Sequence, residues 1–169
     1  AGFPYPHVLT VSARLAGRTL TVTTTVTATG DTPVPLCFGF HPYLQLPGVP
    51  RAEWTIRTPP LRHLALDDRG LPTGSTETQP EQEILLADKG FDDAYDQVPE
   101  GAVFAVSGGG RRLEVHFERG YPATQIFAPP AEDLVCFEPM TAPTDALRRG
   151  GYRCARPGEP AQARFSIRV

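Results

Sequence analysis

The alternation of apolar and polar residues along 19–29 constrains the fold of this chain more than any other feature. Leu20, Val22, Val26 and Ala28 fall on one side of an extended chain, and threonines fill the other side. Threonine and valine are β-branched and fit a pleated, half-buried surface. The same period of two recurs along the chain, whereas apolar residues at helical spacing are almost absent. The pattern predicts an all-β protein.

Ten to twelve short strands are expected, separated by turns, in a single antiparallel β-sandwich domain over residues 1–169. The 16 glycines and 19 prolines lie between the apolar runs, so they indicate turns. The predicted strands are residues 8–15, 19–29, 33–40, 52–57, 61–66, 83–86, 103–106, 111–119, 123–128, 134–139 and 161–169. Residues 67–80 are predicted to form turns and loops, and residues 141–160 an irregular segment. We expect five side chains in the core: Leu20, Val22, Val26, Val115 and Phe117.

Composition excludes several kinds of partner. With 16 basic and 19 acidic residues and no block of lysine or arginine, the sequence gives no reason to expect a nucleic acid partner. No run is long and apolar enough to span a membrane. The three cysteines lack C-x-x-C spacing, which predicts free, buried thiols in a reducing compartment and a cytoplasmic location. The sequence does not indicate an oligomeric state.

His41 is the first candidate for chemistry, because it ends an apolar run and is followed by Pro42. Proline lacks a backbone donor, so the chain must leave a ladder there, and the residue before it is held extended. His41 is therefore expected at a strand end, where its side chain can face a cleft. The alternative is a histidine that only hydrogen-bonds the backbone.

Glu138 also follows an apolar run and precedes a proline. An unpaired carboxylate in such a place is costly to bury, so it is either poised in a site or paired with an arginine. Gln125 is a polar residue inside an apolar strand, and Asp92 and Asp93 could bind sugar hydroxyls or cap a turn. A histidine and a glutamate with aspartate and glutamine nearby fit proton transfer on a polyhydroxylated substrate. No zinc spacing or nucleophile motif is present.

The chain resembles the aldose 1-epimerase (galactose mutarotase) family. The resemblance rests on short motifs in family order: residues 3–6 (FPYP), 41–43 (HPY), 71–74 (LPTG), 91–93 (FDD), and Gln125 with 137–139 (FEP) and Pro143. It implies a large antiparallel supersandwich fold and an isomerase that interconverts the α and β anomers of an aldose. The implied partner is a monosaccharide or sugar phosphate, and no metal or redox cofactor is needed.

The resemblance also implies roles for the candidate residues. His41 corresponds to the general acid at the ring oxygen, and Glu138 to the general base at the anomeric hydroxyl. Asp92, with Asp93 as a rival, corresponds to the ligand of the sugar hydroxyls. Gln125 and Tyr43 match residues near the sugar. A non-catalytic carbohydrate-binding sandwich is the alternative function.

One departure from the family is notable. Family members carry an N-terminal portion with a substrate-binding arginine and a second histidine, and this chain resembles the part that follows it. His7 lies in an ordinary strand pattern outside that motif. If such a portion is absent, we expect unpaired strand edges or an apolar face open to solvent.

Overall fold

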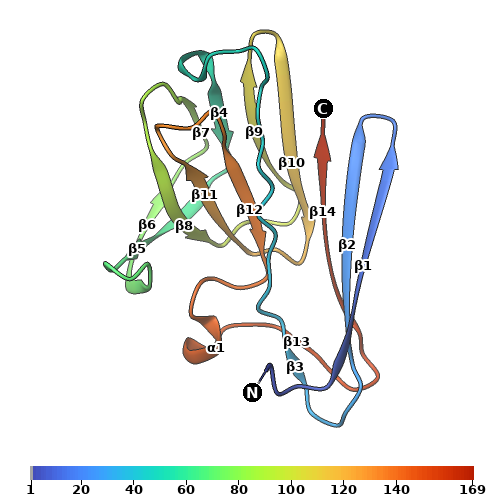
Figure 1. Ribbon diagram of the computed structural model, residues 1–169. Coiled ribbons are helices and arrows are strands. Elements are labelled where there is room, and N and C mark those ends of the chain that lie inside the picture. The colour runs from blue at the N-terminus through green and yellow to red at the C-terminus, as the bar shows by residue number, and fades with distance from the viewer. Residues whose placement is uncertain (1) are drawn as a thin grey trace.

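The computed structural model describes residues 2–169 as two antiparallel sheets packed face to face (Figure 1). In spatial order, the larger sheet contains β1 (His7–Ala16), β2 (Thr19–Ala28), β14 (Ala161–Arg168), β10 (Arg111–Arg119), β9 (Ala102–Gly108), β4 (Thr55–Thr58) and β7 (Gln82–Leu85). The smaller sheet contains β12 (Cys136–Met140), β11 (Ala123–Ala128), β8 (Phe91–Asp96), β5 (Leu61–Leu66) and β6 (Pro72–Gln79). A short pair joins β3 (Val34–Pro35) to β13 (Cys154–Ala155). The predicted all-β antiparallel sandwich is confirmed.

Helix is confined, within residues 2–169, to the 3₁₀ turn η1 (Arg51–Glu53) and the single turn α1 (Ala146–Arg149). Neither is long and apolar enough to cross a membrane. The turn α1 lies within the predicted irregular segment 141–160, which otherwise has little regular structure.

The core lies between the two sheets and is rich in aromatic rings. Phe104 and Phe117 project from the larger sheet and Phe137 from the smaller one, and Phe104 packs against both others with ring centroids 4.8 and 5.4 Å away. All three are almost completely buried. Their burial fixes which side of β12 faces inward, and so which side carries Glu138.

Two strand predictions were wrong. Residues 33–40 form a strand only at Val34–Pro35, because the chain then leaves the short pair and runs irregularly toward β12. Residues 72–79, predicted to be loop from their Gly, Ser and Thr content, form the edge strand β6. Six of its eight residues are exposed, so pairing with β5 holds it extended without an apolar signal.

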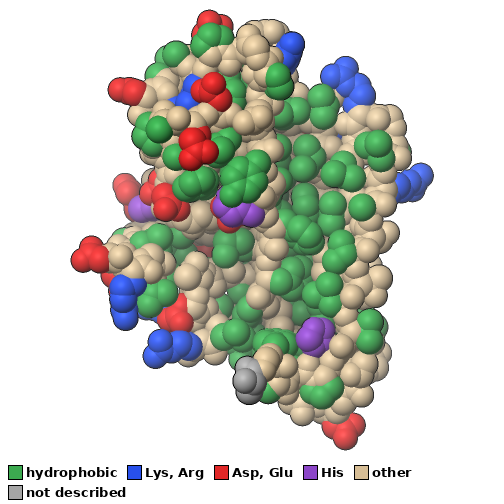
Figure 2. All heavy atoms as spheres, viewed as in Figure 1, with side chains coloured by type: hydrophobic (Ala, Val, Ile, Leu, Met, Phe, Trp, Pro, Cys, Tyr) green, Lys and Arg blue, Asp and Glu red, His purple; other side chains and the backbone are tan. Residues whose placement is uncertain are grey.

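The face of β1 turned toward the sandwich interior is largely uncovered. Leu9, Val11 and Leu15 share that face with the buried Val22 and Val26, yet are 48, 50 and 75% exposed. Figure 2 shows hydrophobic side chains gathered over β14, β2 and β1, where Figure 1 shows no second layer. The expected apolar face open to solvent is confirmed.

The same arrangement corrects one core prediction. Val22, Val26, Val115 and Phe117 are buried as expected, whereas Leu20 is 36% exposed. Leu20 lies opposite Leu15 at the end of the β1–β2 hairpin, beyond the reach of the smaller sheet.

We expect a sharp contrast between two cross-strand neighbours on this face. Leu9 pairs with Val26, which is only 3% exposed. Leu9→Ala should change the free energy of unfolding by less than about 0.5 kcal/mol, as surface substitutions do. Val26→Ala should cost about 2 kcal/mol, because it removes buried apolar surface. Urea denaturation of both variants measures the difference, and equal losses would show that Leu9 is covered in solution.

The cysteines are all free, but only Cys136 is buried. Cys37 and Cys154 are partly exposed near the β3–β13 pair, whose buried residues form a small cluster separate from the main core. The prediction of three buried thiols was therefore wrong for two of them.

Candidate active site

Three neighbouring strands of the smaller sheet present polar side chains on one face. The register pairs Gln125 of β11 with Glu138 of β12 and with Ala94 of β8. Two residues along, Phe127 lies opposite Asp92. Because opposite residues of antiparallel strands point to the same side, Glu138, Gln125 and Asp92 share one face. Ile126 and Phe137, which alternate with Gln125 and Glu138, point into the core.

His41 reaches this face from an irregular segment that runs beside β12. The Phe40 N–H donates to the Pro139 carbonyl oxygen at 3.1 Å, and the Leu44 N–H donates to the Val135 carbonyl at 2.9 Å. A Cβ on Gly39 would lie 2.8 Å from the Pro139 oxygen, so only glycine permits this close approach. His41 was predicted at a strand end, and it instead lies between these two backbone contacts.

The structure brings His41 and Glu138 together. The His41 Nε2 atom lies 3.1 Å from Glu138 Oε1. The His41 side chain is 43% exposed and that of Glu138 is 14% exposed, so the pair lies at the surface with the carboxylate set deeper. Neighbouring oxygen atoms of one substrate could therefore meet both groups.

The surroundings of Glu138 favour its protonated form. Burial raises the pKa of its carboxyl to about 7, and the nearby charge of Asp92 adds to the effect. A carboxyl with a pKa near neutrality can both accept and release a proton at physiological pH. The alternative of a structural ion pair with an arginine does not apply, because the group 3.1 Å from the Glu138 carboxylate is a histidine.

The two adjacent aspartates lie on opposite faces of β8. Asp92 accepts a hydrogen bond from Gln125 Nε2 at 2.7 Å, on the face that carries Glu138. Asp93 points the other way and lies 3.3 Å from Nε2 of His63. Of the two candidates, the structure therefore brings only Asp92 together with the His41–Glu138 pair.

Two aromatic rings flank His41. Tyr43 stacks on the imidazole with centroids 4.6 Å apart and an interplanar angle of 15°. Phe127 meets it edge-on at 5.8 Å. Tyr43 was predicted from the sequence, whereas Phe127 was not, although its spacing of two from Gln125 places both on one face of a strand.

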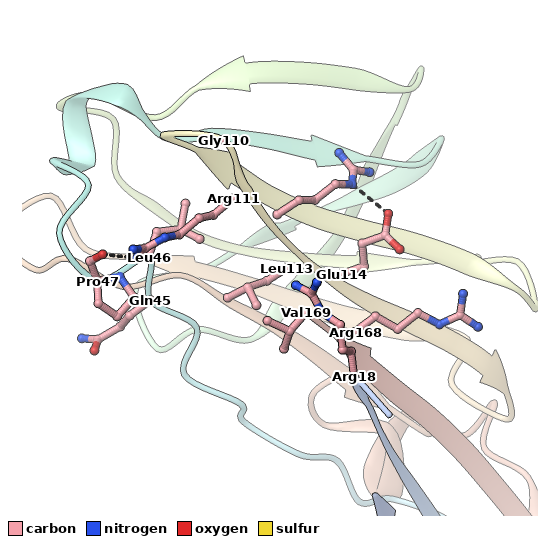
Figure 3. Close-up of a pocket in the computed structure, with 11 residues that line it drawn as sticks. Arg18, Gln45, Leu46, Pro47, Gly110, Arg111, Leu113, Glu114, Arg168 and Val169 are labelled. Atoms are coloured by element: carbon pink, nitrogen blue, oxygen red, sulfur yellow. Dashed lines mark hydrogen bonds and ion pairs between the residues drawn. The ribbon is translucent and has the colours of Figure 1, made fainter. Parts of the chain in front are cut away.

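The cavities do not by themselves locate the site. One of about 470 Å³ is lined by residues that include Gly39 and Met140, but by neither His41 nor Glu138. A larger cavity of about 790 Å³ lies elsewhere, between Leu46, Leu113 and Val169, with arginines at its rim (Figure 3). There Arg111 donates to the Pro47 carbonyl oxygen, and the cavity does not contain the His41–Glu138 pair. Size alone therefore does not identify the site.

Among residues 2–169, no group of three or more His, Cys, Asp or Glu side chains is placed to hold a metal ion. The polar groups of the site are instead arranged as two contacts, His41 with Glu138 and Gln125 with Asp92.

Fold and site together define an antiparallel β-sandwich with a histidine–glutamate contact at the smaller sheet. The sequence matches the family model of aldose 1-epimerase over residues 1–168. The chain belongs to the aldose 1-epimerase family. A comparison with curated proteins gives no significant sequence match.

Solved structures share the fold. A galactose mutarotase related enzyme from Lactobacillus acidophilus is 21% identical with a TM-score of 0.82, over 98% of this chain and 62% of its own. A galactose mutarotase-like protein from Clostridium acetobutylicum is 16% identical with a TM-score of 0.83, over 96% and 56%. The GalM/aldose epimerase homologue from C. elegans is 18% identical with a TM-score of 0.78, over 99% and 61%. The chain thus spans 56 to 62% of the length of these proteins.

Proposed function

We propose that this protein is an aldose 1-epimerase-like isomerase that interconverts the α and β anomers of an aldose or aldose phosphate. The observation that carries the proposal is the 3.1 Å approach of His41 Nε2 to Glu138 Oε1. Opening a sugar ring requires a proton at the ring oxygen while another leaves the anomeric hydroxyl. Both oxygens are bonded to the same carbon, so an acid and a base that serve them must be near neighbours.

In this proposal each residue has one task. Protonated His41 gives its proton to the ring oxygen, and ionised Glu138 takes the proton of the anomeric hydroxyl, so the C1–O5 bond breaks and an open-chain aldehyde forms. Rotation about C1–C2 turns the other face of the aldehyde toward the ring hydroxyl. Closure then reverses both proton transfers and restores the two groups. Asp92 and Gln125 hold sugar hydroxyls, and Tyr43 and Phe127 keep the imidazole in place.

Family membership and the raised pKa of the Glu138 carboxyl both support this proposal over a non-catalytic carbohydrate-binding sandwich. Proton exchange spectroscopy on equilibrated aldoses separates the two functions. An epimerase produces exchange cross peaks between the α and β anomeric protons. A binding protein shifts or broadens those signals without cross peaks beyond those of buffer.

The pH dependence of mutarotation follows from the pKa of Glu138, which burial and Asp92 raise to about 7. The base must be ionised, so kcat/KM should rise as pH increases toward 7 and then level off. Asp92→Asn removes one cause of the raised pKa and should move the acid limb to lower pH. A profile flat between pH 5 and 8 would contradict the role of Glu138.

A further inference from the structure

Arg51 is a buried guanidinium whose hydrogen-bond acceptors are all main-chain carbonyls. Only 6% of the residue is exposed, and its donors reach the oxygens of Ala87, Lys89 (2.8 Å) and Ala128 (3.2 Å). Burying a charged group is costly unless its hydrogen bonds are satisfied. The three acceptors come from two separate segments, so Arg51 ties those segments together.

The two segments lie next to Asp92, the residue proposed to bind sugar hydroxyls. Ala87 and Lys89 lie in the turn between β7 and β8, and Ala128 ends β11, where it pairs with Phe91, the first residue of β8. Asp92 is the next residue. Arg51 therefore joins the turn before Asp92 to the strand that carries Gln125, its hydrogen-bond partner.

The turn between β7 and β8 contains a residue in an uncommon backbone conformation. Ala87 has a φ of 39°, a left-handed conformation that is uncommon for a residue with a side chain. Such conformations persist where surrounding contacts hold them. Arg51 supplies such a contact, because it bonds the carbonyl of Ala87 itself.

We propose that Arg51 is a positioning residue that holds Asp92 against Gln125 and beside Glu138. It acts through the backbone of the β7–β8 turn and does not itself touch the sugar. The functional part of this inference rests on the proposed epimerase function, but the placement of Asp92 can be tested without any activity.

The direct test is a ¹³C titration of the Glu138 carboxyl in wild type, Arg51→Lys and Arg51→Met. Asp92 from β8 and His41 from the segment beside β12 face this carboxyl, and Cys136 lies on its own strand. Wild type should titrate near pH 7. In both variants the midpoint should move down as Asp92 retreats, with the smaller change in Arg51→Lys. The midpoint should stay above the ordinary pKa of a glutamate, because burial is the larger cause of the raised pKa of Glu138.

Ile56→Val is the matched control, since Ile56 is fully buried in β4, the strand that follows Arg51. It should lower Tm without moving the Glu138 midpoint.

In activity assays Arg51→Lys should raise KM on the order of tenfold, less than the 10²-fold that a 1 Å displacement can cost, with kcat nearly unchanged. An unmoved midpoint in both variants, an equal shift in Ile56→Val, or global unfolding of Arg51→Lys would overturn the proposal. A shifted midpoint in a protein without epimerase activity would refute only the proposed function.

Discussion

Replacing Glu138 with glutamine should lower the mutarotation rate by on the order of 10²–10⁴-fold while sugar binding survives. Glutamine keeps the shape and hydrogen-bonding capacity of the side chain but cannot accept the proton of the anomeric hydroxyl. The loss should therefore appear in kcat, whereas the affinity measured by calorimetry should change little. A variant with near-normal turnover would remove Glu138 from the mechanism.

The control for this variant is Glu114→Gln. Glu114 also contacts a histidine, with its Oε2 atom 2.8 Å from Nε2 of His116, but both lie on β10 of the larger sheet. It should retain full activity. A comparable loss in both variants would mean that any glutamate–histidine contact in the fold matters, which the proposed mechanism does not predict.

The Glu138→Gln protein should also be the more stable one at alkaline pH. The folded pKa of Glu138 is raised to about 7, above its unfolded value, so the folded protein binds the extra proton. That contribution to stability is fully present below the unfolded pKa and is lost as pH rises through 7. Above pH 8 wild type should be less stable than the variant by at most roughly 3 kcal/mol. Urea denaturation of wild type and Glu138→Gln at pH 5 and 9 measures the sign of this difference in stability.

The second large effect is expected for His41→Asn. Asparagine can still contact Glu138, but it has no proton to give to the ring oxygen, so kcat should fall by on the order of 10²-fold or more. Because the His41 ring is also held between Tyr43 and Phe127, some loss of sugar affinity should accompany the loss of turnover.

His63→Asn is the matched control for the histidine. His63 likewise approaches a carboxylate, Asp93, at 3.3 Å, but on the opposite face of the smaller sheet from Asp92. We expect its activity to remain within a few fold of wild type. An inactive His63 variant beside an active His41 variant would move the reaction to the other face of the sheet.

The fold was predictable wherever one face of a strand packs on the core. The alternation in residues 19–29 and 111–119 reproduces β2 and β10 to within a residue, because burial on one side imposes a period of two. The alternation of apolar and polar residues did not predict β6, which is exposed on both sides, or the exposure of Leu20, which depends on what covers the β1–β2 hairpin. Neither feature can be predicted from the local sequence.

The candidate site was predictable as a set of residues but not as an arrangement. Proline after His41 and after Glu138 was expected to mark strand ends. That expectation was wrong for Glu138, because the pairing of β12 with β11 continues through Pro139 to Met140. The choice between Asp92 and Asp93 required the register of β8 against β11, which sets the face of each side chain. Arg51 carried no local signal, because its acceptors are main-chain carbonyls far away in the sequence.

The central claim is that this protein catalyses anomer interconversion, and polarimetry tests it most directly. Freshly dissolved α-glucose and α-galactose, and their 6-phosphates, are followed with wild type, with Glu138→Gln and with buffer alone. The account predicts that wild type shortens the approach to the equilibrium rotation for at least one sugar, in proportion to protein concentration, and that Glu138→Gln follows the buffer curve. Wild-type curves that coincide with buffer for every sugar that calorimetry shows to bind would contradict it.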